Sequence, residues 1–187
     1  PGCALFVLMK GEKYLMKIAV IGYSGAGKST LAKQLGEYYG LPVLFLDCVQ
    51  FTAGWQLRDR EEALSLVDTF MKQDGWVIDG NYRQFFQARR LEEADRILFL
   101  NFSRFYCLLQ AMRRYHHNKG KTRSDMADGC IEKMDAEFVK WILWDGRIRK
   151  RKKHYRWITQ TYRDKTVVLK SRRQVRKFLA ALQSKNT

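Results

Sequence analysis

The chain has 187 residues, enough for one domain with a substantial core and too few for two domains of ordinary size. Its hydrophobic content of 46% is typical of a globular protein, and its longest apolar runs are strand-sized, so we expect a soluble protein with no membrane span. The 35 Lys and Arg residues outnumber the 19 Asp and Glu residues, and the formal net charge of +16 indicates an anionic partner. Phosphorylated small molecules and nucleic acids both satisfy that requirement.

Two features set the expected compartment and boundaries. The cysteines are scattered without C-x-x-C spacing, as is typical of free thiols in a reducing cytoplasm. They are Cys3, Cys48, Cys107 and Cys130. The strand and helix pattern starts only at Met16, so we expect residues 1–15 to be an N-terminal extension or a cloning remnant and residues 16–187 to form a single domain.

The first apolar run, 17–21, predicts a strand, and it leads directly into Gly-Tyr-Ser-Gly-Ala-Gly-Lys-Ser at 22–29. This is a complete G-x-x-x-x-G-K-S phosphate loop, in which glycines let successive N–H groups point at phosphate oxygens. We expect Lys28 to reach the β- and γ-phosphates of ATP and the Ser29 hydroxyl to bind Mg²⁺. The expected ATP-binding residues are Gly22, Ser24, Gly25, Ala26, Gly27, Lys28, Ser29 and Thr30.

An amphipathic helix follows the loop, since Leu31, Leu35 and Tyr38 recur at i, i+4 and i+7 before Gly40 and Pro42. A helix that begins near the loop would direct the positive end of its dipole at the same phosphates.

Four more short apolar runs, separated by helical patterns, predict four further buried strands at 43–46, 76–78, 97–100 and 166–169. Strands that alternate with helices predict an α/β fold with a five-stranded parallel sheet flanked by helices. In such sheets the ligand lies at the carboxyl ends of the strands.

Helix boundaries are predicted from capping residues. Asp59, with Glu62 three residues further on, predicts the start of the second helix, and Gly75 predicts its end. Ser103 and Ser171 are candidate caps of later helices. The long helical stretch 131–162 is expected to break at Asp145-Gly146.

Two of the predicted strands end in an acid, Asp47 and Asp79, so both carboxylates should lie at the nucleotide edge of the sheet. In phosphate-loop enzymes a strand-end aspartate holds Mg²⁺ directly or through water, and we favour Asp79, together with Ser29, for this role. The alternative for each acid is a carboxylate that caps the next turn.

The segment Asp-Gly-Asn-Tyr-Arg at 79–83 resembles the Asp-Gly-Phe-Pro-Arg segment of adenylate kinases, in which the aspartate serves the metal and the arginine binds the acceptor phosphate. The proline of that segment is missing here. From Met16 onward the chain is similar to the DNA topology modulation proteins, an adenylate-kinase-like set. The similarity rests on the phosphate loop, Leu46-Asp47, Gly54-Trp55, the segments 76–82 and 122–126, and Ser171-Arg172-Arg173.

This resemblance implies a nucleoside-monophosphate-kinase-like core with an acceptor-binding segment at 48–75 and a lid at 116–135. Gln50, Phe51, Trp55 and Arg58 are candidates for the acceptor pocket, although the two aromatic rings are equally compatible with ordinary packing. The substrate-binding residues implied on the acceptor side are Asp47, Arg58, Asn81 and Arg83.

Phosphoryl transfer spreads negative charge over the equatorial oxygens, so arginines near the lid are candidate catalytic residues beside Lys28. Arg113 and Arg114 lie on the helix after the fourth predicted strand, and Arg123 lies in the predicted lid. Each is also compatible with an ordinary surface arginine.

The densest charge in the chain is Arg147–Arg156, on a predicted helix. A solvated helix face, with one or two members near the γ-phosphate, explains it most simply. Nucleic-acid contact is the alternative, because backbone phosphates require only clustered Lys and Arg.

The first functional hypothesis is therefore a Mg²⁺-dependent kinase that moves the γ-phosphoryl group of ATP to a small acceptor. If the acceptor is a hydroxyl, Asp47 is expected to orient or deprotonate it; if it is a nucleoside monophosphate, Arg58 and Arg83 bind its phosphate. The second hypothesis is a nucleotide-regulated DNA-binding protein that affects DNA topology, and the third is an ATP-binding protein without an acceptor.

Overall fold

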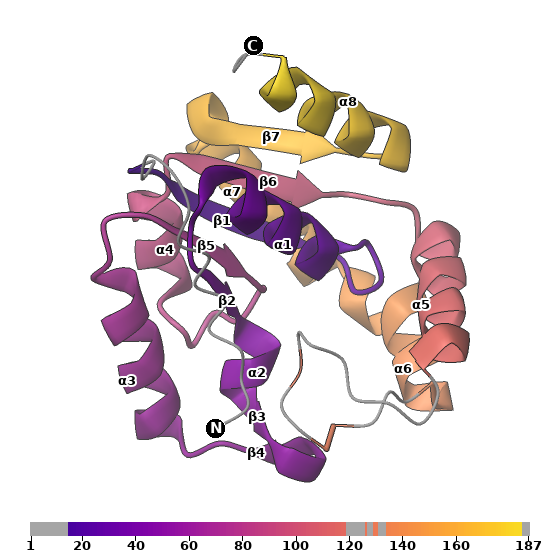
Figure 1. The fold of residues 1–187 in the computed structure, drawn as a ribbon. Helices are drawn as coiled ribbons and strands as arrows, with labels where there is room; N and C mark the ends of the chain where they lie inside the picture. The colour runs from indigo at the N-terminus through magenta and orange to yellow at the C-terminus, as the bar shows by residue number, and fades with distance from the viewer. Residues whose placement is uncertain (1–14, 119–125, 127–128, 131–133, 185–187) are drawn as a thin grey trace.

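A computed structural model of the chain describes residues 15–118, 126, 129–130 and 134–184 (Figure 1). Its centre is a five-stranded parallel sheet in the order β2-β5-β1-β6-β7. The strands are β1 (Lys17–Gly22), β2 (Val43–Phe45), β5 (Trp76–Asp79), β6 (Arg96–Leu100) and β7 (Thr166–Leu169). The α/β fold and the five predicted strands are confirmed, since each strand overlaps one of the apolar runs.

The register of the sheet decides which residues meet at its carboxyl edge. Val20 lies opposite Asp79, and Asp79 in turn lies opposite Phe45. The residues that follow these positions are Gly22 on β1 and Asp47 after β2, so the phosphate loop and both strand-end acids lie on neighbouring strands at one edge. This is the edge at which parallel α/β sheets bind ligands.

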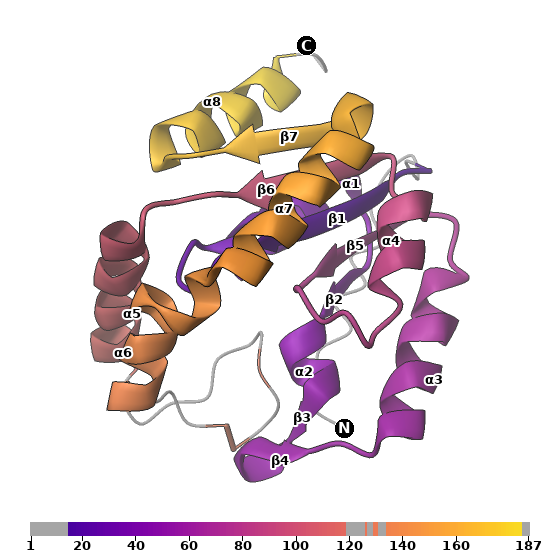
Figure 2. The same ribbon diagram turned by 180° about the vertical axis from the view of Figure 1, so that it is seen from behind.

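Eight α-helices are described, and they surround the sheet (Figures 1 and 2). Helix α1 covers one face of the sheet, and α7 crosses the opposite face. Helices α5 and α6 pack together beyond the carboxyl end of β6. The helices are α1 (Lys28–Tyr39), α2 (Leu46–Gln50), α3 (Arg60–Met71), α4 (Gln87–Glu93), α5 (Arg104–Asn118), α6 (Ala136–Leu143), α7 (Arg149–Thr161) and α8 (Arg172–Gln183).

The predicted helix caps are present. The Asp59 carboxylate accepts hydrogen bonds from the N–H groups of Glu61 and Glu62 at 2.9 and 3.1 Å, at the start of α3. Ser103 and Ser171 each accept an N–H from three residues further on, at 3.3 Å, at the starts of α5 and α8. Such a cap satisfies an N–H that the helix itself cannot, and it contributes about 1 kcal/mol.

Some boundaries differ from the prediction. Helix α3 ends at Met71 with Lys72 in a right-handed conformation, so Gly75 does not end it. Residue 46 belongs to α2 rather than to the preceding strand. The predicted break at Asp145-Gly146 is confirmed, because the 3₁₀ turn η2 (Asp145–Arg147) separates α6 from α7.

A small hairpin between α2 and α3 was not predicted. It pairs β3 (Phe51–Thr52) with β4 (Gln56–Leu57) around the 3₁₀ turn η1 (Ala53–Trp55). Helix α4 lies between β5 and β6, and the 3₁₀ turn η3 (Arg163–Lys165) lies between α7 and β7.

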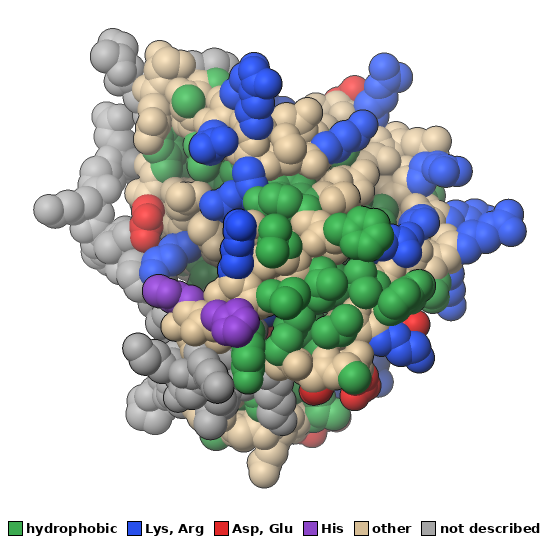
Figure 3. Space-filling view, turned by 90° about the vertical axis from the view of Figure 1, so that its right-hand side faces the viewer, with side chains coloured by type: hydrophobic (Ala, Val, Ile, Leu, Met, Phe, Trp, Pro, Cys, Tyr) green, Lys and Arg blue, Asp and Glu red, His purple; other side chains and the backbone are tan. Residues whose placement is uncertain are grey.

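Hydrophobic side chains gather on the face formed by α5 and α6 (Figure 3). Phe105, Leu109 and Met112 of α5 are exposed by 73, 44 and 44%, and Trp144 after α6 is exposed by 57%. None of the described helices has both the length and the apolarity required to cross a bilayer.

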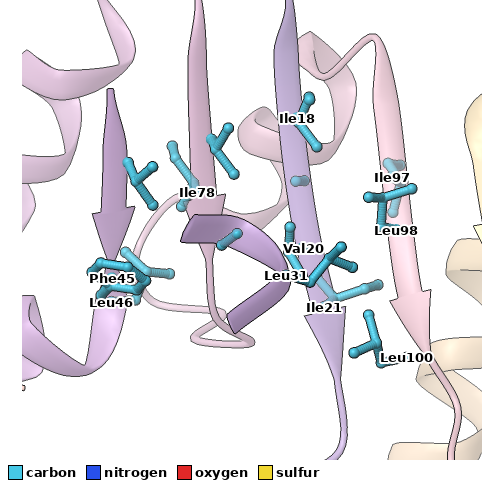
Figure 4. Close-up of a cluster of buried hydrophobic side chains, with 14 of the residues drawn as sticks. Ile18, Val20, Ile21, Leu31, Phe45, Leu46, Ile78, Ile97, Leu98 and Leu100 are labelled. Atoms are coloured by element: carbon cyan, nitrogen blue, oxygen red, sulfur yellow. The ribbon is translucent and has the colours of Figure 1, made fainter. Parts of the chain in front are cut away.

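The main core lies on both faces of the sheet (Figure 4). Ile18, Val20 and Ile21 of β1 are buried, as are Leu31 and Leu35 on the inner side of α1. Complete burial of a side chain of this size contributes about 1.5–3 kcal/mol, so β1 and α1 form a rigid base for the loop between them.

Candidate active site

The phosphate loop turns back from β1 into α1 in a conformation that requires glycine. Gly25 and Gly27 have φ values of +78° and +87°, in the left-handed region that L side chains rarely adopt. A Cβ on Gly25 would lie 2.4 Å from the carbonyl oxygen of Cys107, so the loop also packs too tightly for a side chain. The N-cap of α1, Gly27, contributes no side-chain hydrogen bond, which leaves the first N–H groups of the helix available to phosphate oxygens.

The two predicted Mg²⁺ ligands are in contact. The Ser29 hydroxyl donates a 2.8 Å hydrogen bond to Oδ2 of Asp79, at the end of β5. Asp79 is 4% exposed. A hydroxyl and a carboxylate are the hard oxygen donors that Mg²⁺ prefers beside nucleotide phosphates, so these two residues fit the ion.

Lys28 lies over the loop that precedes it. Its ammonium group is 3.4 Å from the carbonyl oxygen of Tyr23, a long and weak contact. Ala26, within the loop, is buried, whereas Thr30 is exposed in the first turn of α1. The ammonium group therefore lies at the loop, where its hydrogen bond to Tyr23 is weak.

The other strand-end acid, Asp47, is held by a tyrosine. The Tyr82 hydroxyl donates a 2.6 Å hydrogen bond to Oδ1 of Asp47. Burial raises the pKa of Tyr82 well above its ordinary value, and the negative charges of Asp47 and then Asp79 raise it further. The phenol is therefore a permanent donor that lies close to both acids. Within the described residues, Oδ2 of Asp47 accepts no hydrogen bond.

Arg58 has contacts within the protein that differ from the acceptor role predicted for it. Its guanidinium donates to the carbonyl oxygens of Val49 at 3.0 Å and Cys48 at 3.4 Å, near the end of α2, and it pairs with Glu62. Only 16% of the side chain is exposed. Arg58 therefore ties α2 to α3.

Asn81 braces the phosphate loop. Its side-chain Oδ1 accepts the N–H of Gly22 at 3.0 Å, and its Nδ2 donates to the carbonyl oxygen of Gly22 at 2.7 Å. Both groups of the amide are thus used at the start of the loop, a contact that the sequence did not indicate. The fourth predicted substrate residue, Arg83, is exposed.

A buried arginine supports the segment that carries Asn81 and Tyr82. The Arg90 guanidinium is fully buried and donates to the carbonyl oxygens of Phe85, Tyr82 and Gly80 at 2.7, 2.8 and 3.4 Å. Burial lowers the pKa of Arg90 to about 10, and the charge of Asp79 opposes this change. Sequence reasoning missed this residue because Arg89 and Arg90 look alike in an exposed helical pattern.

Two side chains from the α6–α7 region cover the phosphate loop. Trp141 donates its indole N–H to the Ser24 hydroxyl at 3.1 Å. The Arg147 guanidinium lies 3.7 Å from the centre of the Tyr23 ring. Arg147 is the first residue of the basic run, so one member of that run contacts a residue of the phosphate loop.

Tyr155 of α7 also contacts the loop. Its hydroxyl donates to the carbonyl oxygen of Gly22 at 3.3 Å, and its ring stacks on Phe99 of β6 at 4.6 Å. Burial raises the pKa of Tyr155 above the ordinary tyrosine value. Aromatic residues at helical spacing are common in cores, and the ring of Tyr155 packs in that way while its hydroxyl bonds to the loop.

Two of the candidate catalytic arginines, Arg113 and Arg114, lie on α5. Arg113 is exposed and Arg114 is half-buried. They follow Cys107, whose carbonyl approaches Gly25, by six and seven residues, which places them about 9–10 Å further along α5. Arg123 lies outside the described residues.

The described part of the predicted lid lies against the predicted acceptor-binding segment. Met126 and Cys130 are buried and pack against Phe51 and Trp55. The Cys130 thiol donates to the carbonyl oxygen of Thr52 at 3.2 Å. The described residues of the predicted lid therefore contact the predicted acceptor-binding segment.

Comparison with solved structures identifies proteins that share this architecture. The chain resembles shikimate kinase from Acinetobacter baumannii in complex with shikimate, with a TM-score of 0.55, 16% identity and coverage of 92% of this chain and 96% of that one. An uncharacterized protein from Eubacterium ventriosum matches with a TM-score of 0.51, 15% identity and coverage of 90% and 96%. A protein from Thermus thermophilus gives 0.51, 15%, 92% and 98%.

These likenesses show the fold, a P-loop α/β domain of the shikimate kinase type. No protein-family model and no curated protein sequence matches the chain. The similarity to the DNA topology modulation proteins thus stays a hypothesis.

Proposed function

We propose that the protein is a Mg²⁺-dependent phosphotransferase that moves the γ-phosphoryl group of ATP to a hydroxyl group of a small acceptor. The observation that carries this proposal is the pair formed by Asp47 and Tyr82 beside the Ser29–Asp79 contact. Two acids at the same edge of the sheet, Asp79 at the end of β5 and Asp47 in α2, thereby have different partners. One is bonded to the loop hydroxyl that would bind the metal, and the other is held by a phenol on the acceptor side.

The contacts of the arginines favour a hydroxyl acceptor over a nucleoside monophosphate. A monophosphate needs cations to bind it, and the Nε, Nη1 and Nη2 atoms of Arg58 each already have a partner, among the carbonyl oxygens of α2 and Glu62. Arg83 remains as the other candidate. A hydroxyl acceptor needs a base instead, and Oδ2 of Asp47, which accepts no hydrogen bond from the described residues, suits that role.

In the proposed reaction, the acceptor oxygen attacks the γ-phosphorus while the bond from that phosphorus to the leaving oxygen of ADP breaks. The acceptor proton passes to the Asp47 carboxylate, and Tyr82 keeps that carboxylate in position. The N–H groups of the phosphate loop and Lys28 hold the phosphates. Mg²⁺, when bound by Ser29 and Asp79, supplies charge neutralisation between the β- and γ-phosphates.

The segment boundaries belong to the proposal as well. Residues 48–75 form the acceptor-binding segment, and 116–135 form the lid. Arg113, Arg114 and Arg123 are candidates to stabilise the transferred phosphoryl group when the lid is closed.

The test measures ADP production with ATP and Mg²⁺ against a panel of sugars, polyols, hydroxy acids and nucleoside monophosphates. Asp47→Asn should leave the affinity for a fluorescent ATP analogue unchanged and lower acceptor-stimulated turnover by about 10²–10⁴-fold, the usual contribution of a general base. Lys28→Ala, the control, should weaken both. Stimulation by monophosphates alone, with Asp47→Asn fully active, would exclude the hydroxyl acceptor. ATP binding without stimulation by any member of the panel would favour an ATP-binding protein that lacks an acceptor.

A further inference from the structure

The outer side of α7 carries a dense group of cations that the proposed kinase reaction does not use. We call it the α7 cation cluster, and it consists of Arg149, Lys150, Lys152, Lys153 and Arg156. All five side chains are exposed. In the described part of the chain none of them forms an ion pair with a carboxylate.

The cluster is unfavourable for the helix that carries it. The first turn of α7 contains no acid, and its N-cap, Ile148, offers no side-chain hydrogen bond. Cations near the N-terminus oppose the helix dipole. Arg149 with Lys153, and Lys152 with Arg156, are like charges at i, i+4, which repel each other. By contrast, α3 begins with the Asp59 cap.

Packing on the inner side of α7 offsets this repulsion. Ile158 is fully buried, and Tyr155 stacks on Phe99 and bonds to the phosphate loop. The protein therefore keeps five cations together on a rigid helix in spite of their mutual repulsion. Such a surface gains most from an anionic ligand that neutralises several charges at once.

An exposed tryptophan lies next to the cations. Trp157 and Gln160 line a hollow on this side of the molecule together with the α7 cation cluster. The indole of Trp157 is 45% exposed, yet its orientation is defined by its neighbours. His154 lies nearly parallel to it, with 5.8 Å between ring centres and 15° between ring planes, and Tyr162 meets it edge-on at 6.0 Å.

We infer that the outer side of α7 binds single-stranded nucleic acid, with backbone phosphates on the α7 cation cluster and a base stacked on Trp157. From Arg149 to Arg156 the cations extend over about 10 Å of helix, a length that suits a chain of phosphates better than one phosphate group. Aromatic side chains beside a cationic surface are the usual platform for unpaired bases. A duplex keeps its base faces inside its own stack, so the exposed indole favours a single strand.

A lipid surface fits less well. The hollow contains one aromatic residue and no aliphatic one. The exposed apolar side chains Phe105, Leu109 and Met112 belong to α5, a different helix.

The test compares two triple variants that remove equal charge from exposed helix surfaces. One is Lys152→Gln/Lys153→Gln/Arg156→Gln in α7, and the control is Arg173→Gln/Arg176→Gln/Lys177→Gln in α8. Binding of a labelled 20-nucleotide oligo-dT is followed by fluorescence anisotropy at several salt concentrations. The α7 variant should bind at least tenfold more weakly at 0.15 M salt, and the slope of log K against log salt should fall by about two, at 0.7 per lost phosphate contact. The α8 variant should stay within about twofold of the unmodified protein.

The stacking part of the inference is tested separately. Trp157→Ala should weaken oligo-dT binding by about tenfold, and Trp157→Phe, which keeps an aromatic face, should restore most of it. Binding of a 20-base-pair duplex should be unaffected by either change. Because the α7 triple variant removes repulsion, its melting temperature should equal or exceed that of the unmodified protein, so weak binding cannot be attributed to unfolding.

Three results would overturn the inference. Equal losses in the α7 and α8 variants would show attraction by net charge alone. If the duplex binds as tightly as oligo-dT, and Trp157→Ala changes the affinity for neither, the stacking of a base on Trp157 would be excluded. Binding to vesicles that contain anionic lipid, without binding to oligo-dT at 0.15 M salt, would identify the surface as a lipid site.

Discussion

Replacement of the buried Arg90 should destabilise the protein strongly. Its guanidinium is fully buried and serves the carbonyl oxygens of Phe85, Tyr82 and Gly80, in the segment that carries Asn81. Methionine fills much of the same volume but has no donor, so Arg90→Met leaves these carbonyl groups unsatisfied inside the protein.

The expected loss follows from the bond lengths. The bonds to Phe85 and Tyr82 are 2.7 and 2.8 Å long and have a charged donor, for which the net contribution is about 1.5–3 kcal/mol each. The bond to Gly80, at 3.4 Å, is too long to count. Arg90→Met should therefore lower the free energy of unfolding by about 3–6 kcal/mol. At about 2–4 °C per kcal/mol for a domain of this size, the melting temperature should fall by about 6–24 °C.

Urea unfolding followed by tryptophan fluorescence and circular dichroism measures this loss. The matched control is Arg89→Gln, the neighbouring arginine, whose side chain is 42% exposed and forms surface ion pairs with Asp68 and Glu93. Its loss should be much smaller, because exposed ion pairs contribute little. If Arg90→Met unfolds within about 1 kcal/mol of the unmodified protein at unchanged m-value, the role assigned to Arg90 is wrong.

Three further predictions concern the loop and the titration of α7. Gly25→Ala should abolish binding of a fluorescent ATP analogue, because the added Cβ would lie 2.4 Å from a backbone carbonyl oxygen. The control is Gly54→Ala, since Gly54 has a similar φ of +70° but open space around it. That variant should lose only about 1–2 kcal/mol of stability and keep nucleotide binding. Tyr155 has a raised pKa in the folded state, so its stabilising contribution is complete below pH 10 and is lost as pH rises above 10. In Tyr155→Phe the free energy of unfolding should therefore fall less steeply as pH rises above 10, as measured by alkaline titration monitored by circular dichroism. Burial, and secondarily the positive charge of Arg83, lower the pKa of His154 below its ordinary value. Arg83→Gln should therefore raise the His154 pKa measured by NMR, and an unchanged pKa would exclude this effect of the Arg83 charge.

The sheet and the phosphate loop were predictable because local sequence determines them. A buried parallel strand needs a short apolar run, and the loop needs glycine where φ is positive. The residues within the segments 17–21 and 22–29 are therefore sufficient to predict the strand and the loop. The helix caps at Asp59, Ser103 and Ser171 are local in the same sense.

The partners of polar side chains were not predictable in this way. Arg58 and Asn81 were predicted to bind a substrate, and the sequence did not indicate that they also contact the backbone of α2 and of Gly22. Residues of the same type serve either purpose, and only the tertiary arrangement decides between them. The contact of Asp79 with Ser29 was easier to expect, since both lie at the same sheet edge.

The two sides of helix α7 have different contacts, and the binding of a ligand on one side can therefore affect the other. Its inner side holds the first carbonyl of the phosphate loop through Tyr155, and Arg147 just before it rests on Tyr23. Its outer side carries the α7 cation cluster. A ligand that displaces or stiffens the helix from outside would change the affinity of the loop for ATP, and ATP would change the affinity for that ligand by the same factor, because coupling free energies are reciprocal. Helix α7 thereby connects the phosphate loop with the α7 cation cluster.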